Sequence, residues 1–310
     1  MIIVRFTSGL GNQMYQYNLY RLLKETYPDT PVKADLTWFY AHNDHHGYEL
    51  EKCFAHDDSA FSIECATYRE LFRVTGLIPN MSKNHGRGFE KFRRYPNRIL
   101  REFTQKRRAP FTLDRLQQDV SMETVLHLDL AKDWYLIGFW IESPYWRDRI
   151  PSLQKELCFD ENYGKKNQEL IRSIRESESV SIHVRRGDYL TTYAGQFKAL
   201  SDDYYKKAVE EIKKVCDTPK FYIFSDDSAF IRREFDWIKD KVIVDHNTGD
   251  DSYRDMQLMS LCKHNIIANS TFSAWAAILN RNPEHVTVYP AACLKDEDSE
   301  EIKLKNWIRI

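Results

Sequence analysis

The chain starts with a short run of apolar residues. A glycine-containing loop and then an amphipathic segment follow this run. Residues 2–6 are mostly apolar, which predicts a buried strand. Residues 13–25 predict a helix with an apolar face formed by Met14, Leu19, Leu22 and Leu23. A second apolar run at 31–36 predicts another strand. This strand–loop–helix–strand order is typical of an α/β domain.

Apolar runs and amphipathic segments alternate regularly in the second half of the chain. The apolar runs predict strands at 134–140, 180–184, 221–224, 242–244, 265–268 and 286–289. The amphipathic segments predict helices at 166–175, 202–215, 227–238, 252–262 and 271–280. Such alternation is typical of a second α/β unit with a parallel sheet. Residues 40–130 show no clear period, so no element is predicted there.

Length and proline positions indicate two domains. The chain has 310 residues, whereas a single domain usually has about 100–150. Pro144 and Pro151 interrupt the apolar pattern that follows residue 140. We therefore expect an N-terminal domain over residues 1–150 and a C-terminal domain over residues 151–310.

Charge is balanced over the whole chain but concentrated locally. The formal net charge is −1, which gives no reason to expect a nucleic-acid partner. Between Lys83 and Arg108, ten Lys or Arg residues stand against only Glu90 and Glu102. This stretch is typical of a solvated helix face. It is also typical of a surface that contacts anionic lipid headgroups or an anionic acceptor, so peripheral membrane contact through 83–108 stays open.

The six cysteines are scattered, at positions 53, 65, 158, 216, 262 and 293. They form no Cys-x-x-Cys pair, and no His joins them at the spacing of metal ligands, so we expect no zinc site. We expect them to be reduced, buried packing residues of a cytosolic protein. The chain turns polar after six residues and has no apolar run of about 18 residues, which predicts a cytoplasmic location without a signal peptide or membrane span.

The strongest chemical signal is the sequence Ser-Ile-His-Val-Arg-Arg-Gly-Asp-Tyr at 181–189. It continues a predicted buried strand, and ligands of open α/β sheets bind at the carboxyl ends of strands. The guanidinium groups of Arg185 and Arg186 match the oxygen atoms of a diphosphate, and Gly187 permits a sharp turn. Asp188 is able to fix an arginine or to accept a proton. The same residues are also typical of a structural ion-pair cluster.

Two further polar clusters follow predicted strands. Ser and Thr residues lie at the start of the predicted helix at 271–280, where backbone N–H groups and the helix dipole favour an anion. Asp226 and Asp227 follow the strand at 221–224, and carboxylates there are able to bind a purine edge or ribose hydroxyl groups. Both clusters are equally typical of helix N-caps.

Together these clusters resemble the glycosyltransferase family 11 fucosyltransferases, whose members are largely galactoside α-1,2-fucosyltransferases. The match is close at 183–189, which is similar to the His-x-Arg-Arg-x-Asp signature of α-1,2-, α-1,6- and protein O-fucosyltransferases. It extends in order over most of the chain, through Gly-Leu-Gly-Asn-Gln-Met at 9–14, Gly-Phe-Trp at 138–140, Asp-Met-Gln-Leu-Met at 255–259 and Asn-Ser-Thr-Phe-Ser at 269–273.

The resemblance implies a GT-B fold, in which two Rossmann-like domains have a cleft between them. It implies an inverting, metal-independent enzyme that transfers L-fucose from GDP-fucose to a galactose-type hydroxyl of a glycan, in α-1,2 linkage. The C-terminal domain would hold GDP-fucose, and the N-terminal domain would bind the acceptor, such as a polysaccharide repeat unit. Two alternatives stay open: a transferase that uses another GDP-sugar, and a non-catalytic module that binds a sugar nucleotide.

The resemblance also implies roles for single residues. Arg185 would contact the β-phosphate beside the breaking bond, and Asp188 is the nearest carboxylate to it in the sequence. The residues implied in donor binding are His183, Arg186, Gly187, Asp226, Asp227, Ser270, Thr271, Ser273, Gly9, Gly11 and Asn12. Among them, the histidine would touch the nucleotide, one aspartate would read guanine, and the three hydroxyl residues would hold phosphate oxygens. The residues of the first loop would lie across the cleft.

Fixed cations would then take the place of a metal and stabilise the charge that grows on departing GDP. Asp-Glu-Asp at 296–298 is similar to the Asp-x-Asp motif of metal-dependent transferases, but it lies in an acidic run that is typical of a solvated loop. Some relatives in the wider fucosyltransferase group carry a glutamate shortly after the arginine motif, but here Tyr193 and uncharged neighbours occupy that stretch, so the resemblance implies no base there. His45, His46 and Glu49 are further candidates, and an oxocarbenium-like transition state needs less help from a base.

Overall fold

The computed structural model describes residues 1–42, 46–79, 96, 122–141, 143–190, 199–291 and 304–310, which form two compact units. Unit 1 consists of Met1–Lys52 and Phe61–Glu142, and unit 2 consists of Cys53–Ala60 and Ser143–Ile310. His45, the acidic run at 296–301 and the basic stretch at 83–108, apart from Pro96, lie outside the described residues. The predictions made for them therefore stay predictions.

Unit 1 is built on a parallel sheet with the strand order β2-β1-β3. Its strands are β1 (Ile2–Arg5), β2 (Val32–Asp35) and β3 (Trp134–Leu136), and helix α1 (Leu10–Thr26) connects the first two. The predicted strand–helix–strand unit is confirmed. The predicted strand at 134–140 is too long, because the chain turns out of the sheet after Leu136 and reaches a left-handed φ of 51° at Trp140.

The other helices described in unit 1 are short. They are η1 (Thr37–Tyr40), α2 (Leu50–Phe54), which continues into unit 2, α3 (Tyr68–Thr75) and α5 (Met122–Val125). Helix α3 forms because both of its ends are capped. The Thr67 hydroxyl accepts from the Glu70 N–H, the Glu70 carboxylate accepts from the Thr67 N–H, and Gly76 ends the helix with a left-handed φ of 68°.

Gln13, a fully buried residue of α1, fixes two loops at the carboxyl edge of the unit 1 sheet. Its Nε2 donates to the carbonyl oxygens of Ser8 and Gly47, both at 2.8 Å, and its Oε1 accepts from the Glu49 N–H at 3.0 Å. Ser8 and His46 both have a left-handed φ of 65°, which is unusual for residues other than glycine. Such strain persists only where surrounding contacts hold the backbone in place, as the glutamine does here.

Gln16, one turn further along α1, fixes a third loop in the same way. Its Oε1 accepts from the Thr7 N–H at 2.9 Å, and its Nε2 donates to the Gly138 carbonyl at 3.0 Å. This loop follows β3 and contains Trp140 with its left-handed φ. The two buried glutamines therefore explain why a helix face that contains polar residues packs on this sheet.

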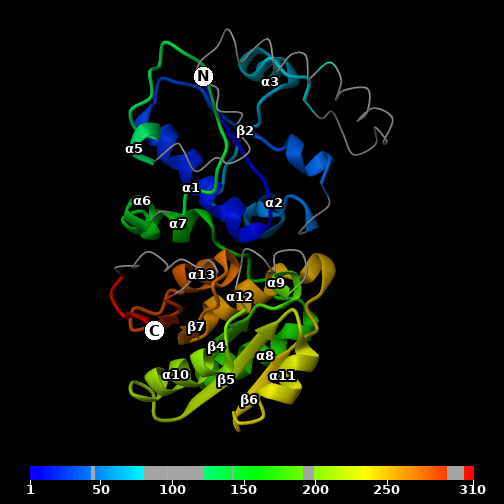
Figure 1. Cartoon of the computed structure of the whole chain (residues 1–310), viewed down its shortest axis with the longest axis vertical. Coiled ribbons are helices and arrows are strands. Elements are labelled where there is room, and N and C mark those ends of the chain that lie inside the picture. The colour runs from blue at the N-terminus through cyan, green and yellow to red at the C-terminus, as the bar shows by residue number, and fades with distance from the viewer. Residues whose placement is uncertain (43–45, 80–95, 97–121, 142, 191–198, 292–303) are drawn as a thin grey trace. The chain divides into compact units, whose positions relative to one another are not determined.

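Unit 2 is built on a parallel sheet of six strands in the order β6-β5-β4-β7-β8-β9 (Figure 1). The strands are β4 (Glu178–Val184), β5 (Pro219–Ser225), β6 (Lys241–Val244), β7 (His264–Ile266), β8 (Thr287–Tyr289) and β9 (Trp307–Arg309). The chain moves outward from β4 through β5 to β6, and then returns to form β7 on the other side of β4. The predicted second α/β unit is confirmed.

Helices cover both faces of this sheet. The helices described in unit 2 are α6 (Ser143–Arg147), α7 (Ile150–Glu156), η3 (Lys165–Asn167), α8 (Gln168–Glu176), α9 (Gly187–Leu190), α10 (Asp202–Lys213), α11 (Ser228–Glu234), η4 (Gly249–Asp251), α12 (Tyr253–Leu261) and α13 (Thr271–Ile278). Side chains of α10 and α11 pack in one core with Val180, Ile182 and Ile223. Helix α8 lies on the opposite face, where the Ser173 hydroxyl meets that of Tyr222 at 2.7 Å.

In the part of the chain described, no helix is long and apolar enough to cross a membrane.

The cysteines are only partly as predicted. Cys53, Cys216 and Cys262 are buried. Cys65 is exposed and Cys158 is partly exposed, so the prediction of buried packing residues is wrong for both. The exposure of Cys65 has a topological reason, because its segment forms only an isolated bridge with Ala34 of the edge strand β2.

Candidate functional site

The sheet of unit 2 changes its direction of winding between β4 and β7. In open α/β sheets, ligands bind outside the carboxyl ends of the strands at such a point. Residues 185–189 follow β4 at this edge, and residues 267–273 follow β7 and enter α13. Strand β5, which pairs with β4 up to Ser225, adds the two aspartates that follow it. The fold therefore brings the three predicted polar clusters to one edge of one sheet (Figure 1).

Arg185 forms an ion pair with Asp226 at this edge, with 3.1 Å between Nη1 and Oδ2. The two side chains are 27% and 25% exposed, so the pair is accessible to solvent. The Arg186 N–H donates to Asp226 Oδ1 at 2.9 Å, which holds the carboxylate in place. Since carboxylates and phosphates present similar oxygen atoms to a guanidinium, the Arg185 side chain is arranged to bind an anion.

Gly187 allows the chain after β4 to pass close to Asp226. A Cβ atom at this position would lie 3.0 Å from Asp226 Oδ2, at the limit of what real side chains show. A larger residue would therefore press on the carboxylate that pairs with Arg185. Asp188 is the second residue of α9, and its side chain lies outside the described part of the structure, so its catalytic role stays a prediction.

Arg186 and Asp227 make local packing contacts. The Arg186 guanidinium lies 3.5 Å from the centre of the Phe230 ring, and its Nε is 3.6 Å from Asp227 Oδ2. Asp227 is the N-cap of α11, and its side chain accepts from the Phe230 N–H at 2.9 Å. Asp227 thus has the capping role that the sequence left open, whereas Asp226 contacts Arg185.

His183 lies near the end of β4 and is only 5% exposed. Its Nδ1 is buried and has no hydrogen-bond partner among the described residues. Burial, and then the charge of Arg185, lower the pKa of the imidazole to about 3. The ring is therefore neutral at physiological pH. A buried nitrogen without a partner at the end of a strand is well placed to contact a ligand.

The start of α13 supplies the other side of this edge. Ser270 caps the helix, since its hydroxyl accepts from the Phe272 N–H at 3.4 Å. Ser273 is fully buried and its hydroxyl donates to the carbonyl oxygens of Ala268 and Ser270. Thr271, the first helical residue, is partly exposed. The serines thus serve the local helix start, while the helix dipole and Thr271 offer positive potential and a hydroxyl to an anion.

Tyr189 holds the segments after β4 and β7 together. Its hydroxyl donates to the Asn269 carbonyl at 2.7 Å, and its ring centre lies 6.0 Å from the Arg185 guanidinium. The sequence analysis treated Tyr189 only as the end of a motif. No spacing rule predicts a contact between residues 80 positions apart.

The first-loop residues belong to unit 1. Gly9 is the N-cap of α1, Gly11 is buried, and the Asn12 N–H donates to the Gly9 carbonyl at 3.0 Å. Their expected position across a cleft from the donor stays a prediction. Of the further base candidates, His46 is exposed at the left-handed loop position described above, and Glu49 is 5% exposed.

The family model for "Glycosyl transferase family 11" matches residues 114–310, which is more than half of the chain. The chain belongs to glycosyltransferase family 11. It is accordingly a glycosyltransferase, and the family resemblance seen in the sequence is confirmed.

Relatives in this family differ in the sugar that their names specify. The chain is 26% identical over 318 residues to an alpha-1,2-colitosyltransferase of Escherichia coli, and the match covers 100% of this chain and 99% of that protein. It is 35% identical over 136 residues to the O-antigen biosynthesis glycosyltransferase WbnK of E. coli, covering 43% and 45% of the two chains. It is 27% identical over 186 residues to the mouse galactoside 2-alpha-L-fucosyltransferase Sec1, covering 50% of each.

Solved fucosyltransferase structures share the fold. POFUT1 in complex with GDP-fucose superposes with a TM-score of 0.53 at 12% identity, covering 93% of this chain and 97% of that one. Fucosyltransferase NodZ from Bradyrhizobium gives a TM-score of 0.51 at 13% identity, covering 90% and 91%. The family 11 chain therefore has the GT-B fold, and the predicted fold class is confirmed.

A buried polar network surrounds Asp255, which opens the family motif at 255–259. Asn247 Nδ2 donates to Asp255 Oδ1 at 2.8 Å, and Asn167 Nδ2 donates to Asn247 Oδ1 at 3.0 Å. His246 Nε2 lies 2.6 Å from Asn167 Oδ1. Burial raises the pKa of the Asp255 carboxyl to about 7, although the hydrogen bond from Asn247 acts in the opposite direction.

We expect Asp255→Asn to remove a pH dependence of stability. The pKa of the folded carboxyl, about 7, exceeds the unfolded value of about 4, so its stabilising contribution is full below pH 4 and is lost as the pH rises through 7. Asparagine keeps the acceptor oxygen and does not titrate. Between about pH 5 and pH 8, the Tm of the wild type should fall by roughly 5 °C more than that of the variant. Parallel Tm curves in scanning calorimetry would contradict this.

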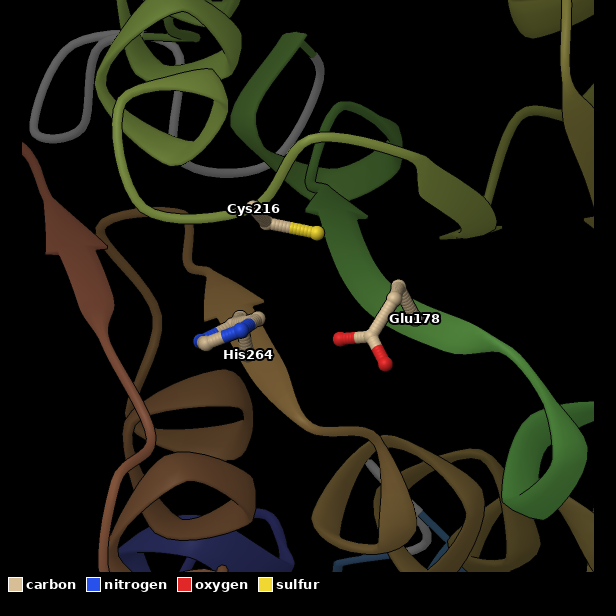
Figure 2. A group of neighbouring side chains, drawn as sticks. All are labelled: Glu178, Cys216 and His264. Carbon is tan, nitrogen blue, oxygen red and sulfur yellow. The ribbon is translucent and has the colours of Figure 1, made fainter.

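Figure 2 shows a second cluster, at the amino-terminal ends of the strands of unit 2. Glu178 begins β4, His264 begins β7 and Cys216 precedes β5, and one ligand-type atom from each lies within 4.8 Å of the other two. Cys216 and His264 are 48 positions apart, so no spacing along the chain indicates their approach, which the strand order of the sheet produces.

The hydrogen bonds of this cluster do not fit a metal ion. The Val286 N–H donates to His264 Nδ1 at 3.0 Å, and burial lowers the pKa of this histidine. The neutral ring therefore carries its proton on Nε2, which leaves that nitrogen no lone pair for a metal. Glu178 is also paired with the Lys263 ammonium group. His264 and Glu178 are thus each bonded to a residue outside the cluster, Val286 and Lys263 respectively.

Proposed function

We propose that this family 11 glycosyltransferase transfers L-fucose from GDP-fucose to a galactose-type hydroxyl of a glycan, with inversion and in α-1,2 linkage. The observation that carries the proposal is that Arg185, which forms an ion pair with Asp226, and the start of α13 follow neighbouring strands at the point where the sheet changes direction. Relatives named galactoside 2-alpha-L-fucosyltransferase and a solved neighbour in complex with GDP-fucose support it. In this proposal, residues 151–310 hold the donor and residues 1–150 bind the acceptor.

Arg185 would stabilise the leaving group. The acceptor hydroxyl attacks the anomeric carbon of fucose while the bond to the β-phosphate breaks, so negative charge grows on that phosphate. The Asp226 carboxylate lies 3.1 Å from Nη1 of Arg185. A phosphate oxygen of the donor would bind the guanidinium at this place, either instead of the carboxylate or beside it. The dipole of α13 would favour the same charge from the other side of the edge.

His183 and Asp226 would contact the guanosine part of the donor. The neutral, buried imidazole has an Nδ1 without a partner among the described residues, and Asp226 is held by the Arg186 N–H. Asp188 is proposed to receive the proton of the acceptor hydroxyl. A transition state with oxocarbenium character keeps the demand on this base low.

We expect catalysis to need no metal ion. In this proposal, Arg185 and the start of α13 would supply the positive potential that stabilises the growing charge of the diphosphate. Dialysis against EDTA should therefore leave kcat within about 2-fold of the untreated enzyme. Loss of activity with EDTA and its recovery with Mn²⁺ or Mg²⁺ would contradict this, and would direct attention to Asp296 and Asp298.

A second donor has specific support. The relative matched over the full length of this chain is an alpha-1,2-colitosyltransferase, which favours a different sugar nucleotide as the alternative to GDP-fucose. The test is a screen of GDP-fucose, GDP-colitose and GDP-mannose against galactosides, with the product linkage determined by NMR. The proposal expects a fucosyl product linked α-1,2 to galactose. Turnover of GDP-colitose alone would establish the alternative, and GDP binding without turnover would indicate a non-catalytic module.

A cytoplasmic location is part of the proposal, and contact with anionic membranes through residues 83–108 stays a prediction. If that contact forms, binding to anionic vesicles should weaken steeply with salt, because each engaged Lys or Arg contributes about 1 kcal/mol. Equally weak binding to neutral and anionic vesicles would favour the solvated-face interpretation.

A further inference from the structure

A pocket of about 340 Å³ opens in unit 1 just beyond the carboxyl end of β2. It is lined by Leu36, Thr37, Tyr40, Cys65, Ala66, Thr67 and Tyr68. Backbone hydrogen bonds join its two walls to the sheet, since Ala34 donates to the Glu64 carbonyl and Ala66 donates to the Ala34 carbonyl, both at 2.8 Å. The pocket therefore belongs to the fixed frame of unit 1, at the edge where α/β sheets bind ligands.

Two exposed tyrosines form part of the lining of this pocket. Tyr40 is 39% exposed and Tyr68 is 40% exposed, whereas Tyr15, Tyr17 and Tyr20 of α1 are at most 2% exposed. Large aromatic rings that stay at a concave surface commonly mark a binding site. A tyrosine offers an apolar ring face to the C–H groups of a sugar and a hydroxyl to its polar edge.

Three carboxylates lie near the pocket, and one of them, that of Glu64, is paired with the Lys33 ammonium group at 3.0 Å. Burial, and then the charges of Glu51, Asp35 and Glu64, raise the pKa of the Cys65 thiol, so these carboxylates lie close to it. None of the residues that line the pocket carries a positive charge. Carboxylates repel an anionic sugar, but they are good acceptors for the hydroxyl groups of an uncharged one.

We propose that this pocket is a subsite for an uncharged pyranose of the acceptor glycan, with Tyr40 and Tyr68 contacting the ring. The inference rests on the proposed function, because it assigns the acceptor of that reaction to unit 1. It adds the pocket that would hold this sugar and the residues that would recognise it.

Kinetics with lactose as acceptor test the role of the tyrosines. Tyr40→Ala and Tyr68→Ala should each raise the KM for lactose about 10-fold and leave the KM for GDP-fucose unchanged. Phe72→Ala is the matched control, because Phe72 is a 49% exposed aromatic residue on α3 that does not line the pocket. An unchanged lactose KM in both tyrosine variants, with an unchanged Tm, would overturn the subsite.

Thiol labelling gives a readout that does not depend on turnover. Cys65 is exposed and lines the pocket, so lactose should slow its reaction with N-ethylmaleimide at least about 5-fold, while labelling of Cys158 should not change. Mass spectrometry of the peptides follows each site in the full-length enzyme. Absence of protection by lactose would overturn the subsite. Equal protection by the anionic 3′-sialyllactose would overturn its preference for an uncharged sugar.

The two measurements separate this inference from the proposed function. Protection of Cys65 by lactose in an enzyme that transfers no fucose would support the subsite and contradict the proposed donor. Transfer of fucose to lactose without any protection of Cys65 would support the proposed function and contradict the subsite.

Discussion

Arg185→Ala is expected to lower kcat roughly 30- to several-thousand-fold while it weakens GDP binding far less. The reason is the stage of the reaction at which negative charge appears on the β-phosphate. Negative charge on the β-phosphate grows as the fucosyl bond breaks, so the contact with Arg185 stabilises the transition state more than the bound donor. The 27% exposed side chain pairs with Asp226 at 3.1 Å, so its guanidinium lies at the sheet edge where the proposed donor would bind.

Arg185→Lys should also lower turnover, but less than the alanine variant. Lysine keeps the positive charge and loses the planar pair of donors that a guanidinium offers to a phosphate. The measurement is single-turnover kinetics together with a GDP titration for both variants. The control is folding, since both variants should keep the Tm of the wild type within a few degrees. Loss of folding in Arg185→Ala would establish the structural ion-pair interpretation, and normal turnover would contradict the donor site.

GDP is expected to inhibit the enzyme at least about 100-fold more strongly than UDP or ADP. The basis is the buried His183 at the end of β4, whose neutral imidazole has an Nδ1 without a partner among the described residues, together with the oriented carboxylate of Asp226. A base that leaves such groups unpaired loses about 1–3 kcal/mol for each of them. Competition assays against GDP-fucose measure the three inhibition constants.

Inorganic pyrophosphate is the control for this comparison. It engages Arg185 and the start of α13 without any base, so its inhibition measures the phosphate contacts alone. Three nucleotides that inhibit equally, and no better than pyrophosphate, would remove the guanine assignment. GDP-fucose as donor would then lose much of its support.

The sequence was sufficient to predict the frame of the sheet edge where Arg185 and Asp226 lie. Strands β4, β5 and β7 are short apolar runs with polar residues directly after them, so the positions of Arg185, Asp226 and Ser270 at one sheet edge followed from the rules for parallel sheets. Strand β9 was missed. It has only three residues, Trp307–Arg309, and follows a polar, acidic stretch, so no apolar run marks it.

Contacts between residues that are far apart along the chain could not be predicted from the sequence. Asp226 pairs with Arg185 while Asp227 caps α11, and Tyr189 bonds to the backbone of Asn269, because neighbouring strands end at the same level. The approach of Cys216 to His264 depends in the same way on the strand order. The left-handed backbone at Trp140 depends on its surroundings, and no residue pattern predicts it.

A crystal structure of the enzyme with GDP tests the central claim most directly. We expect the diphosphate to lie at the carboxyl edge between β4 and β7, with a β-phosphate oxygen about 3 Å from the Arg185 guanidinium and with the start of α13 facing the phosphates. GDP bound elsewhere, with no phosphate oxygen near the Arg185 guanidinium, would contradict the proposed donor site.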